Sequence, residues 1–271
     1  MRGALAGRGP GDRTALLLSA MASPSPPAIE VQHLTKTFEG VLAVDDVSFA
    51  LARGSTTALL GANGAGKTTT IALLLGLLLP SRGSIHVLGE DMLRHRYRAL
   101  PRMNLSSPYV DLLRRLSAYE NLRVYAGLYG LSDVSARIAR LAERVELGEF
   151  LHRPVGNLSA GQHSRVPLAK ALINDPELLL LDEPPASMDP DTADRMRGWL
   201  ERYRTETGAT IVLASHNMSE VERLCDDVLM LKSGTLIDRG APAVLLARYG
   251  RQNMEEVFLH IARGGTAAAA Q

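Results

Sequence analysis

The chain has 271 residues, 46% of them hydrophobic, so a sizeable core can form in one large domain or two small ones. Its formal net charge of +1 gives no reason to expect nucleic acid as a main partner. Cys225 is the single cysteine, which excludes an internal disulfide, and we interpret it as a small buried side chain. The longest apolar run, residues 71–79, is shorter than the roughly 20 residues of a membrane span.

Residues 1–27 are rich in glycine, proline and arginine, and we expect a disordered leader or an over-long start that precedes initiation at Met21. A short apolar run at residues 15–18 makes a weak secretory signal the less favoured alternative. At the other end, residues 251–271 are expected to hold a C-terminal helix and a frayed tail.

Hydrophobic periodicity predicts strands at residues 29–34, 43–51, 55–61 and 83–89, with a buried helix over 65–79. Strand patterns then stop at about residue 105, and helical spacing follows at 118–131 and 133–147. Strand patterns return at 177–184, 209–216 and 226–234, separated by predicted helices such as 189–204. This alternation predicts an α/β fold over residues 28–250, a mostly parallel sheet with an antiparallel β edge and a helical subdomain inserted at about 105–167.

A phosphate-binding loop is predicted by the stretch GANGAGKTT, which fits the pattern G-x-x-x-x-G-K-[ST] between an apolar strand and a helix. Glycines let the backbone curl until several N–H groups point at one phosphate, and the helix adds its positive N-terminal end. Lys67 is expected to reach the β- and γ-phosphates and Thr68 to offer its hydroxyl to Mg²⁺. The candidate binding residues are Gly61, Asn63, Gly64, Ala65, Gly66, Lys67, Thr68 and Thr69.

Two carboxylates, Asp182 and Glu183, end the apolar strand LLLLDE. This placement is costly unless a cation lies nearby, and Mg²⁺ at the phosphate loop supplies one. We expect Asp182 to hold the metal through water and Glu183 to orient or deprotonate the attacking water. His216 follows another apolar strand and is expected to contact the γ-phosphate, whereas Phe38 is either a core residue or a platform for a base.

With these pieces in place, residues from about Ala28 to Gly264 resemble the ATP-binding subunit of an ABC transporter. The stretch NLSAGQHSRV contains the family's LSAGQ signature at residues 158–162, and LLLLDEP, the ASMD turn at residues 186–189 and His216 follow in the family's order. The resemblance implies that Phe38 stacks on adenine. It also implies that two subunits meet head to tail, so that Ser159, Gly161 and Gln162 of one copy cover the ATP held by the other.

The resemblance implies two partners: a separate membrane permease, and either a second copy of this chain or a paralogous ATPase. It also implies that the chain works at the cytoplasmic face of the cell membrane. The chain's length and its ending, MEEVFLHIARGG, resemble export-type subunits of the multidrug and polysaccharide branch. An importer ATPase shares every hydrolytic motif and is the first alternative. A soluble ABC-type ATPase acting on ribosomes or DNA is the second, and a GTPase or small-molecule kinase is the third, although no Asn-Lys-x-Asp guanine-reading motif occurs.

Two departures from the family pattern stand out. The family's glutamine between core and helical insert falls here at about Ser107 or Pro108, and no glutamine occurs nearby. A serine can hold a water but reaches less far, so the family's metal contact and coupling through this loop do not carry over to this sequence. Residues 109–113 are still expected to touch the permease, because the family uses this surface for it. Pro167 lies inside the expected signature helix, where it removes one backbone hydrogen bond and costs about 3 kcal/mol, so we expect a bend or an early break.

Overall fold

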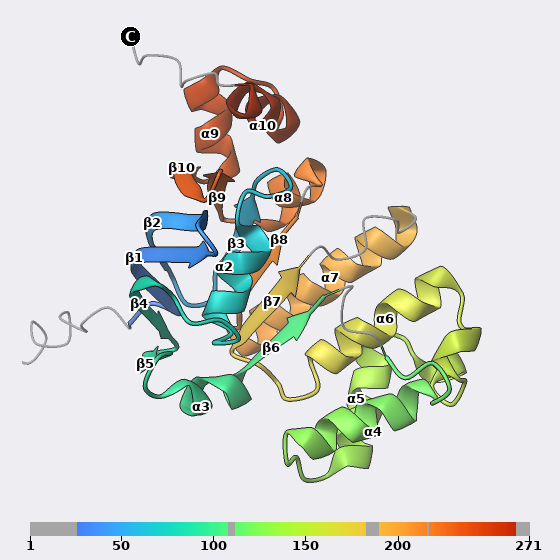
Figure 1. Ribbon diagram of the computed structural model, residues 1–271. Coiled ribbons are helices and arrows are strands. Elements are labelled where there is room, and N and C mark those ends of the chain that lie inside the picture. Colours follow the sequence, from blue (N-terminus) through green and yellow to red (C-terminus); the bar gives the residue numbers. More distant parts are fainter. Residues whose placement is uncertain (1–25, 108–111, 183–189, 216, 264–271) are drawn as a thin grey trace, which may run out of the picture.

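The structure is a computed structural model that describes residues 26–107, 112–182, 190–215 and 217–263. Two sheets form its centre (Figure 1). A four-stranded antiparallel sheet has the order β2-β1-β4-β5, with strands β1 (Ile29–Phe38), β2 (Val41–Leu51), β4 (Arg82–Val87) and β5 (Glu90–Asp91). A six-stranded sheet has the order β10-β9-β3-β8-β7-β6. Its strands are β3 (Thr56–Leu60), β6 (Met103–Ser106), β7 (Leu178–Asp182), β8 (Thr210–Ala214), β9 (Asp227–Lys232) and β10 (Thr235–Gly240).

The six-stranded sheet is parallel from β9 to β6, and only β10 runs antiparallel at its edge. This arrangement confirms the predicted α/β class with a mostly parallel sheet and an antiparallel edge. Parallel strands are buried on both faces, which explains why β3, β7 and β8 are apolar and wholly buried.

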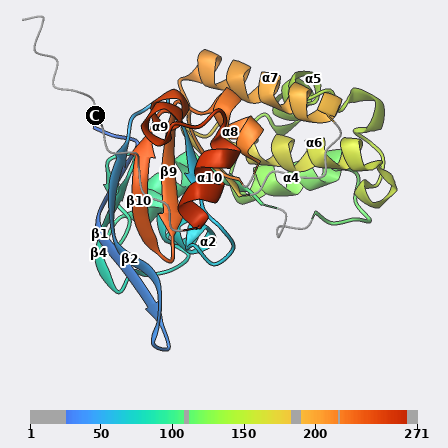
Figure 2. The ribbon, with the colours of Figure 1, turned by 90° about the horizontal axis from the view of Figure 1, so that it is seen from above.

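Alternate residues of β7 belong to different hydrophobic cores. Leu178 and Leu180 pack with the antiparallel sheet and with α2 (Lys67–Leu74), which lies between the two sheets. Leu179 and Leu181 face the opposite core, which contains α4 (Ala118–Leu128), α5 (Val134–Arg144), α6 (Ala160–Ala171), α7 (Pro190–Thr207) and α8 (Met218–Leu224). The central sheet therefore joins a β layer to a helical layer, as Figure 2 shows from above.

Short elements complete the fold. They are α3 (Arg96–Ala99), η1 (Leu100–Arg102), η2 (Gly148–Phe150), η3 (Val155–Asn157), α9 (Pro242–Tyr249) and α10 (Met254–Ala262). The C-terminal helix predicted from the sequence is α10, which buries Met254, Val257 and Ile261 in the helical core. Cys225 is also buried there, and burial raises the pKa of its thiol to about 12. No helix among the described residues is both long and apolar enough to cross a membrane.

Two expectations about elements were wrong. The helix expected over 65–79 ends at Leu74, because Gly76 turns the chain with a φ of 66°, and Leu77 and Leu79 are exposed instead of buried. No strand was predicted between residues 89 and 177, yet β6 lies at Met103–Ser106 and pairs in parallel with β7. Its four residues MNLS carry too short a pattern to recognise.

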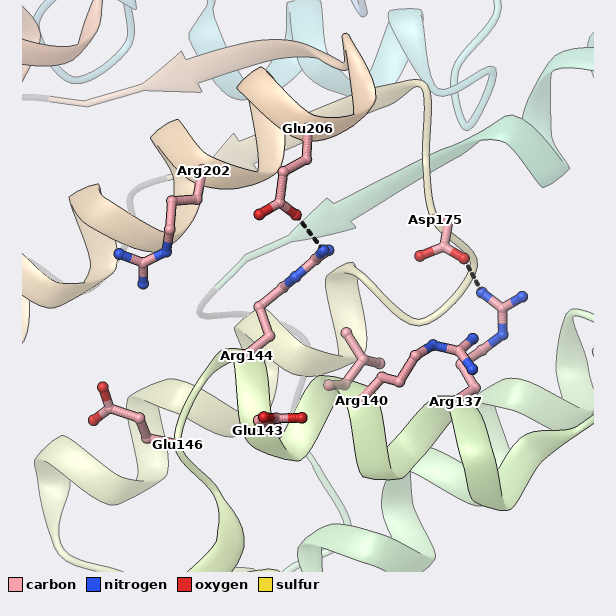
Figure 3. A pocket seen from close by; sticks show the side chains of 9 residues that line it. Arg137, Arg140, Glu143, Arg144, Glu146, Asp175, Arg202 and Glu206 are labelled. Carbon is pink, nitrogen blue, oxygen red and sulfur yellow. Dashed lines mark hydrogen bonds and ion pairs between the residues drawn. The ribbon is translucent and has the colours of Figure 1, made fainter.

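Charged side chains line a cleft of about 470 Å³ between α5 and α7 (Figure 3). Arg137 pairs with Asp175 and Arg144 pairs with Glu206, so these contacts tie the helical insert to the sheet-based core. Partly exposed pairs of this kind contribute at most about 1 kcal/mol each. Four arginines face four carboxylates in the lining, so the cleft has no excess charge that would select an anion or a cation.

Candidate nucleotide-binding site

The phosphate loop connects the buried strand β3 to α2. Gly66 caps the helix at a φ of 99°, and α2 begins at the next residue, Lys67. A side chain at Gly66 would place its Cβ 2.7 Å from the carbonyl oxygen of Ala43, and one at Gly61 would lie 2.7 Å from that of Leu231. Only glycine fits these positions, so the tight curvature is a property of the sequence.

Lys67 is buried, and its ammonium donates hydrogen bonds to the carbonyl oxygens of Gly61 at 2.7 Å and Ala62 at 3.3 Å. The side chain therefore folds back over the loop that precedes it. Asn63, Gly64 and Thr68 are exposed beside it. A helix N-terminus and a buried ammonium on the same loop make a binding site for an anion such as a polyphosphate.

Asp182 lies at the same edge of the sheet as the phosphate loop. The register pairs Leu59 of β3 with Ala214 of β8, and Ala214 with Asp182 of β7. With a strand spacing of about 4.8 Å, the backbone of Asp182 is about 10 Å from that of Leu59, two residues before the loop begins. The carboxylate is buried, with 4% of its residue surface exposed. Its burial at this position requires a compensating group.

Thr68 and Asp182 are the two oxygen donors expected to hold Mg²⁺. Thr68 lies on the first turn of α2, which packs against β7, the strand that carries Asp182. Hard oxygen donors in small number suit Mg²⁺, which keeps several waters and shares its remaining positions with phosphates. Within the described ranges, no cluster of three or more His, Cys, Asp or Glu forms a metal cage. The donor set therefore fits a Mg²⁺ ion that arrives with ATP.

Glu183, His216 and the ASMD turn at residues 186–189 lie outside the described residues. Their strands are described, however, because β7 ends at Asp182 and β8 ends at Ala214. Ser215 is buried and accepts a hydrogen bond from the backbone N–H of Asn217, on the far side of His216. The roles assigned to Glu183 and His216 stay predictions.

The signature begins α6, with Ser159 as its N-cap. The Ser159 hydroxyl accepts from the Gln162 backbone N–H at 3.3 Å, and the Gln162 side chain accepts from the Ser159 N–H at 3.2 Å. This capping box fixes where the helix starts and leaves Ser159 exposed. Gln162, expected as a nucleotide contact, closes the cap of its own helix here. The positive end of α6 with Ser159 and Gly161 is available to an anion from outside.

Pro167 does not end the signature helix, so the expected early break was wrong. α6 continues through Pro167 to Ala171. Val166, Leu168 and Ala169 on either side are buried in the helical core, and this packing offsets the missing backbone hydrogen bond. The alternative, a bend at Pro167, stays a prediction.

Phe38 ends β1 with 40% of its surface exposed, and the Lys36 ammonium lies 4.8 Å from its ring centroid. An exposed ring at a strand end is not a core residue, which favours the second interpretation of Phe38, a platform for a base. The stacking itself stays a prediction.

A buried polar network was missed by sequence reasoning. Asn104 of β6 and Lys170 of α6 are both buried, and the Asn104 amide donates to the carbonyl oxygen of Lys170 and to the Asn174 side chain. Asn174 in turn donates to backbone oxygens of Pro101 and Met103. The only signal in the sequence is a pair of polar residues inside apolar runs, MNLS and LAKAL.

The fold and the site together define a phosphate-loop nucleotide-binding protein, and comparison with known proteins places it more closely. Residues 44–186 match the family model of ABC transporters. The chain belongs to this family, as one of its ATP-binding and ATP-hydrolysing subunits.

Similar proteins support this assignment. The chain is 36% identical over 222 residues to the ABC transporter ATP-binding protein NatA of Bacillus subtilis, covering 81% of this chain and 90% of that protein. It is 35% identical over 238 residues to the Nod factor export ATP-binding protein I of Ralstonia nicotianae, covering 86% and 73%. A solved ATP-binding subunit of an ABC transporter aligns with a TM-score of 0.78 and 27% identity over 87% of this chain and 99% of that one.

A second solved structure is cbiO1 from Clostridium perfringens, described as part of the ABC transporter complex cbiONQ. It aligns with a TM-score of 0.74 and 28% identity over 89% of this chain and 98% of that one.

Proposed function

We propose that this chain drives export through a separate membrane permease, by closing with a second ATPase chain over two ATP molecules at the cytoplasmic face of the membrane. The relatives from Ralstonia and Bacillus are named as an export protein and as an ABC transporter protein, which supports the transport direction and the setting. The observation that supports the paired arrangement is that the two helix starts suited to bind phosphate, those of α2 and α6, belong to separate parts of the chain. Helices α2 and α6 lie apart in both views of the molecule (Figures 1 and 2).

In this arrangement the phosphate loop of one copy holds ATP, and the start of α6 of the other copy covers the γ-phosphate. Lys67 neutralises the phosphates, and Thr68 and Asp182 would hold Mg²⁺, which would supply further positive charge to the phosphates. Glu183 orients the attacking water and accepts its proton. Phe38 stacks on the adenine ring, and His216 contacts the γ-phosphate.

Glu183→Gln is expected to bind ATP, to hydrolyse it at least about a hundredfold more slowly, and to accumulate as an ATP-bound dimer. The amide keeps the shape of the side chain but cannot accept a proton, so the γ-phosphate that joins the two copies persists. Sedimentation or light scattering at saturating Mg-ATP measures the dimer, and ADP serves as the control that should leave the chain monomeric. A variant that stays monomeric with Mg-ATP, also in the presence of the permease, would contradict the paired arrangement.

The permease contact is proposed at an apolar groove of about 420 Å³ between the core and the helical insert. Leu77, which follows α2, and Leu128, at the end of α4, line the groove with 72% and 75% of their surfaces exposed. Exposed leucines on both walls suit an apolar segment from a cytoplasmic loop of the permease. Of the contact expected at residues 109–113, Leu112 is buried, Leu113 is 58% exposed, and the other three lie outside the described residues.

Leu77→Asp combined with Leu128→Asp is expected to abolish co-purification with the multispanning protein encoded by the neighbouring reading frame. Binding of the permease would bury the two new carboxylates. This costs several kcal/mol of binding free energy, on the order of a hundredfold or more in affinity. Leu259→Asp on α10, exposed to 40%, is the matched control and should keep the permease bound. Melting temperatures of all variants check folding. Co-purification with ribosomes in place of a membrane protein would overturn the transport function.

A further inference from the structure

Lys170 is a buried cation whose partners are all uncharged. It lies in the last turn of α6, and its ammonium donates to the carbonyl oxygen of Leu105 at 2.8 Å and to the Asn104 side-chain oxygen at 3.4 Å. The ring of Tyr125 on α4 lies 5.1 Å away. Only 8% of the residue is exposed, and no carboxylate among the described residues forms an ion pair with it. Burial lowers the pKa of the ammonium to about 8.

Burying such a charge costs folding free energy, so a role of its contacts other than stability is expected. A methionine would fill the same space among Tyr125, Leu105 and Asn104 without the cost of desolvating a charge. What a methionine cannot do is donate to the carbonyl oxygen of Leu105. The hydrogen bonds are therefore the property that distinguishes lysine at this position.

The carbonyl group that accepts from Lys170 belongs to Leu105, near the carboxyl end of β6. In the parallel register of β6 and β7, Leu105 is opposite Leu180 and Ser106 is opposite Leu181. The next residue, Ser107, therefore follows beside Asp182 and is itself buried. Fixing Leu105 fixes the path of the chain as it enters the neighbourhood of the proposed metal site.

We propose that Lys170 is a positioning residue for ATP hydrolysis, because its ammonium ties the carboxyl end of β6, beside Asp182, to the helix that begins at Ser159. Helix α6 runs without a break through its 12 residues, a length of about 18 Å, so one continuous element connects the two ends. Docking of the Ser159 end on a nucleotide then presses on the path of Ser106 and Ser107. The inference rests on ATP hydrolysis and on the proposed docking of Ser159 at a nucleotide, and it requires neither the permease nor the direction of transport.

Steady-state ATPase assays of the purified full-length chain test the proposal. Lys170→Met should lower kcat at least about tenfold, as expected for losing one charge-assisted hydrogen bond, and leave KM for ATP within about threefold. Lys170→Arg keeps a permanent charge and donors, and should restore kcat to within about threefold of wild type. A purely structural role would instead change the melting temperature and leave kcat of the folded fraction intact.

The pH profile separates the charge from the shape. Wild-type kcat should fall as pH rises through about 8, where Lys170 loses its proton, and Lys170→Arg should lack this alkaline limb. The other titratable groups on this side are Tyr125 of α4, whose ring lies against the ammonium, and Tyr129, the residue after α4, which lines the same groove as Lys170. They are common to both proteins and cancel in the comparison. Thermal denaturation across the same pH range confirms that each protein stays folded.

Lys232→Met is the matched control, since Lys232 also holds backbone carbonyls at a helix end, those of Ile261 and Ala262. It should keep the alkaline limb. Two results would overturn the proposal: a folded Lys170→Met protein with kcat within twofold of wild type, or a Lys170→Arg protein that retains the limb near pH 8. If Lys170→Met does not fold, the arginine variant alone decides between the two outcomes.

Discussion

Lys67→Ala is expected to weaken ATP binding at least about a hundredfold, or about 3 kcal/mol, and to bring hydrolysis below detection. The ammonium is buried on the loop, where its charge acts on a phosphate with little screening by water. It is held there by the carbonyl oxygens of Gly61 and Ala62, so it does not have to be ordered when ATP arrives. Titration of a fluorescent ATP analogue measures the dissociation constant.

Arg140→Ala is the matched control for Lys67→Ala. Arg140 is an exposed cation on α5 that forms no ion pair with any described residue, so its loss removes the same charge at a distance. The control should bind ATP within about twofold of wild type, because exposed charges separated by more than about 10 Å are screened. Equal weakening in both variants would mean that net charge, and not the loop, governs ATP affinity.

The phosphate loop could be recognised from sequence because local constraints alone determine its shape. Gly61 and Gly66 are required by close backbone approaches, and Lys67 by the charge of the ligand. Buried strands also leave a clear pattern, and the predicted positions of β3, β7 and β8 were confirmed to within two residues. Such features do not depend on what lies elsewhere in the chain.

Features that depend on tertiary partners could not be predicted in the same way. Lys170 in LAKAL is typical of a solvated helix position, and only the packing of β6 and α4 against α6 shows that it is buried. Gln162 matches a binding motif, yet its side chain closes the capping box of its own helix. The tolerance for Pro167 likewise comes from the apolar contacts of its neighbours. In each case a contact from a distant segment outweighs the local signal.

Mixing two inactive variants is expected to restore ATP hydrolysis, since each composite site would take its phosphate loop from one chain and its signature from the other. Lys67→Ala removes the loop function, and Ser159→Arg places a bulky cation at the start of α6, where an anion should dock. Each variant alone should have at most a few per cent of wild-type activity. If chains exchange freely, half of the dimers are mixed and each contains one intact site, which predicts recovery of up to about a quarter of wild-type activity.

The result depends on which chain contributes each half, so it tests the head-to-tail arrangement directly. If Ser159 served the nucleotide of its own chain, a mixed dimer would hold no intact site and no activity would return. Different affinity tags on the two variants show whether mixed dimers form, so that a negative result can be assigned to the arrangement of the sites. Ser159→Arg also removes the helix cap, at a cost of about 1 kcal/mol, and its melting temperature must show that α6 still folds. Recovery of activity would establish that the exposed end of α6 functions only when it meets a nucleotide held by another chain.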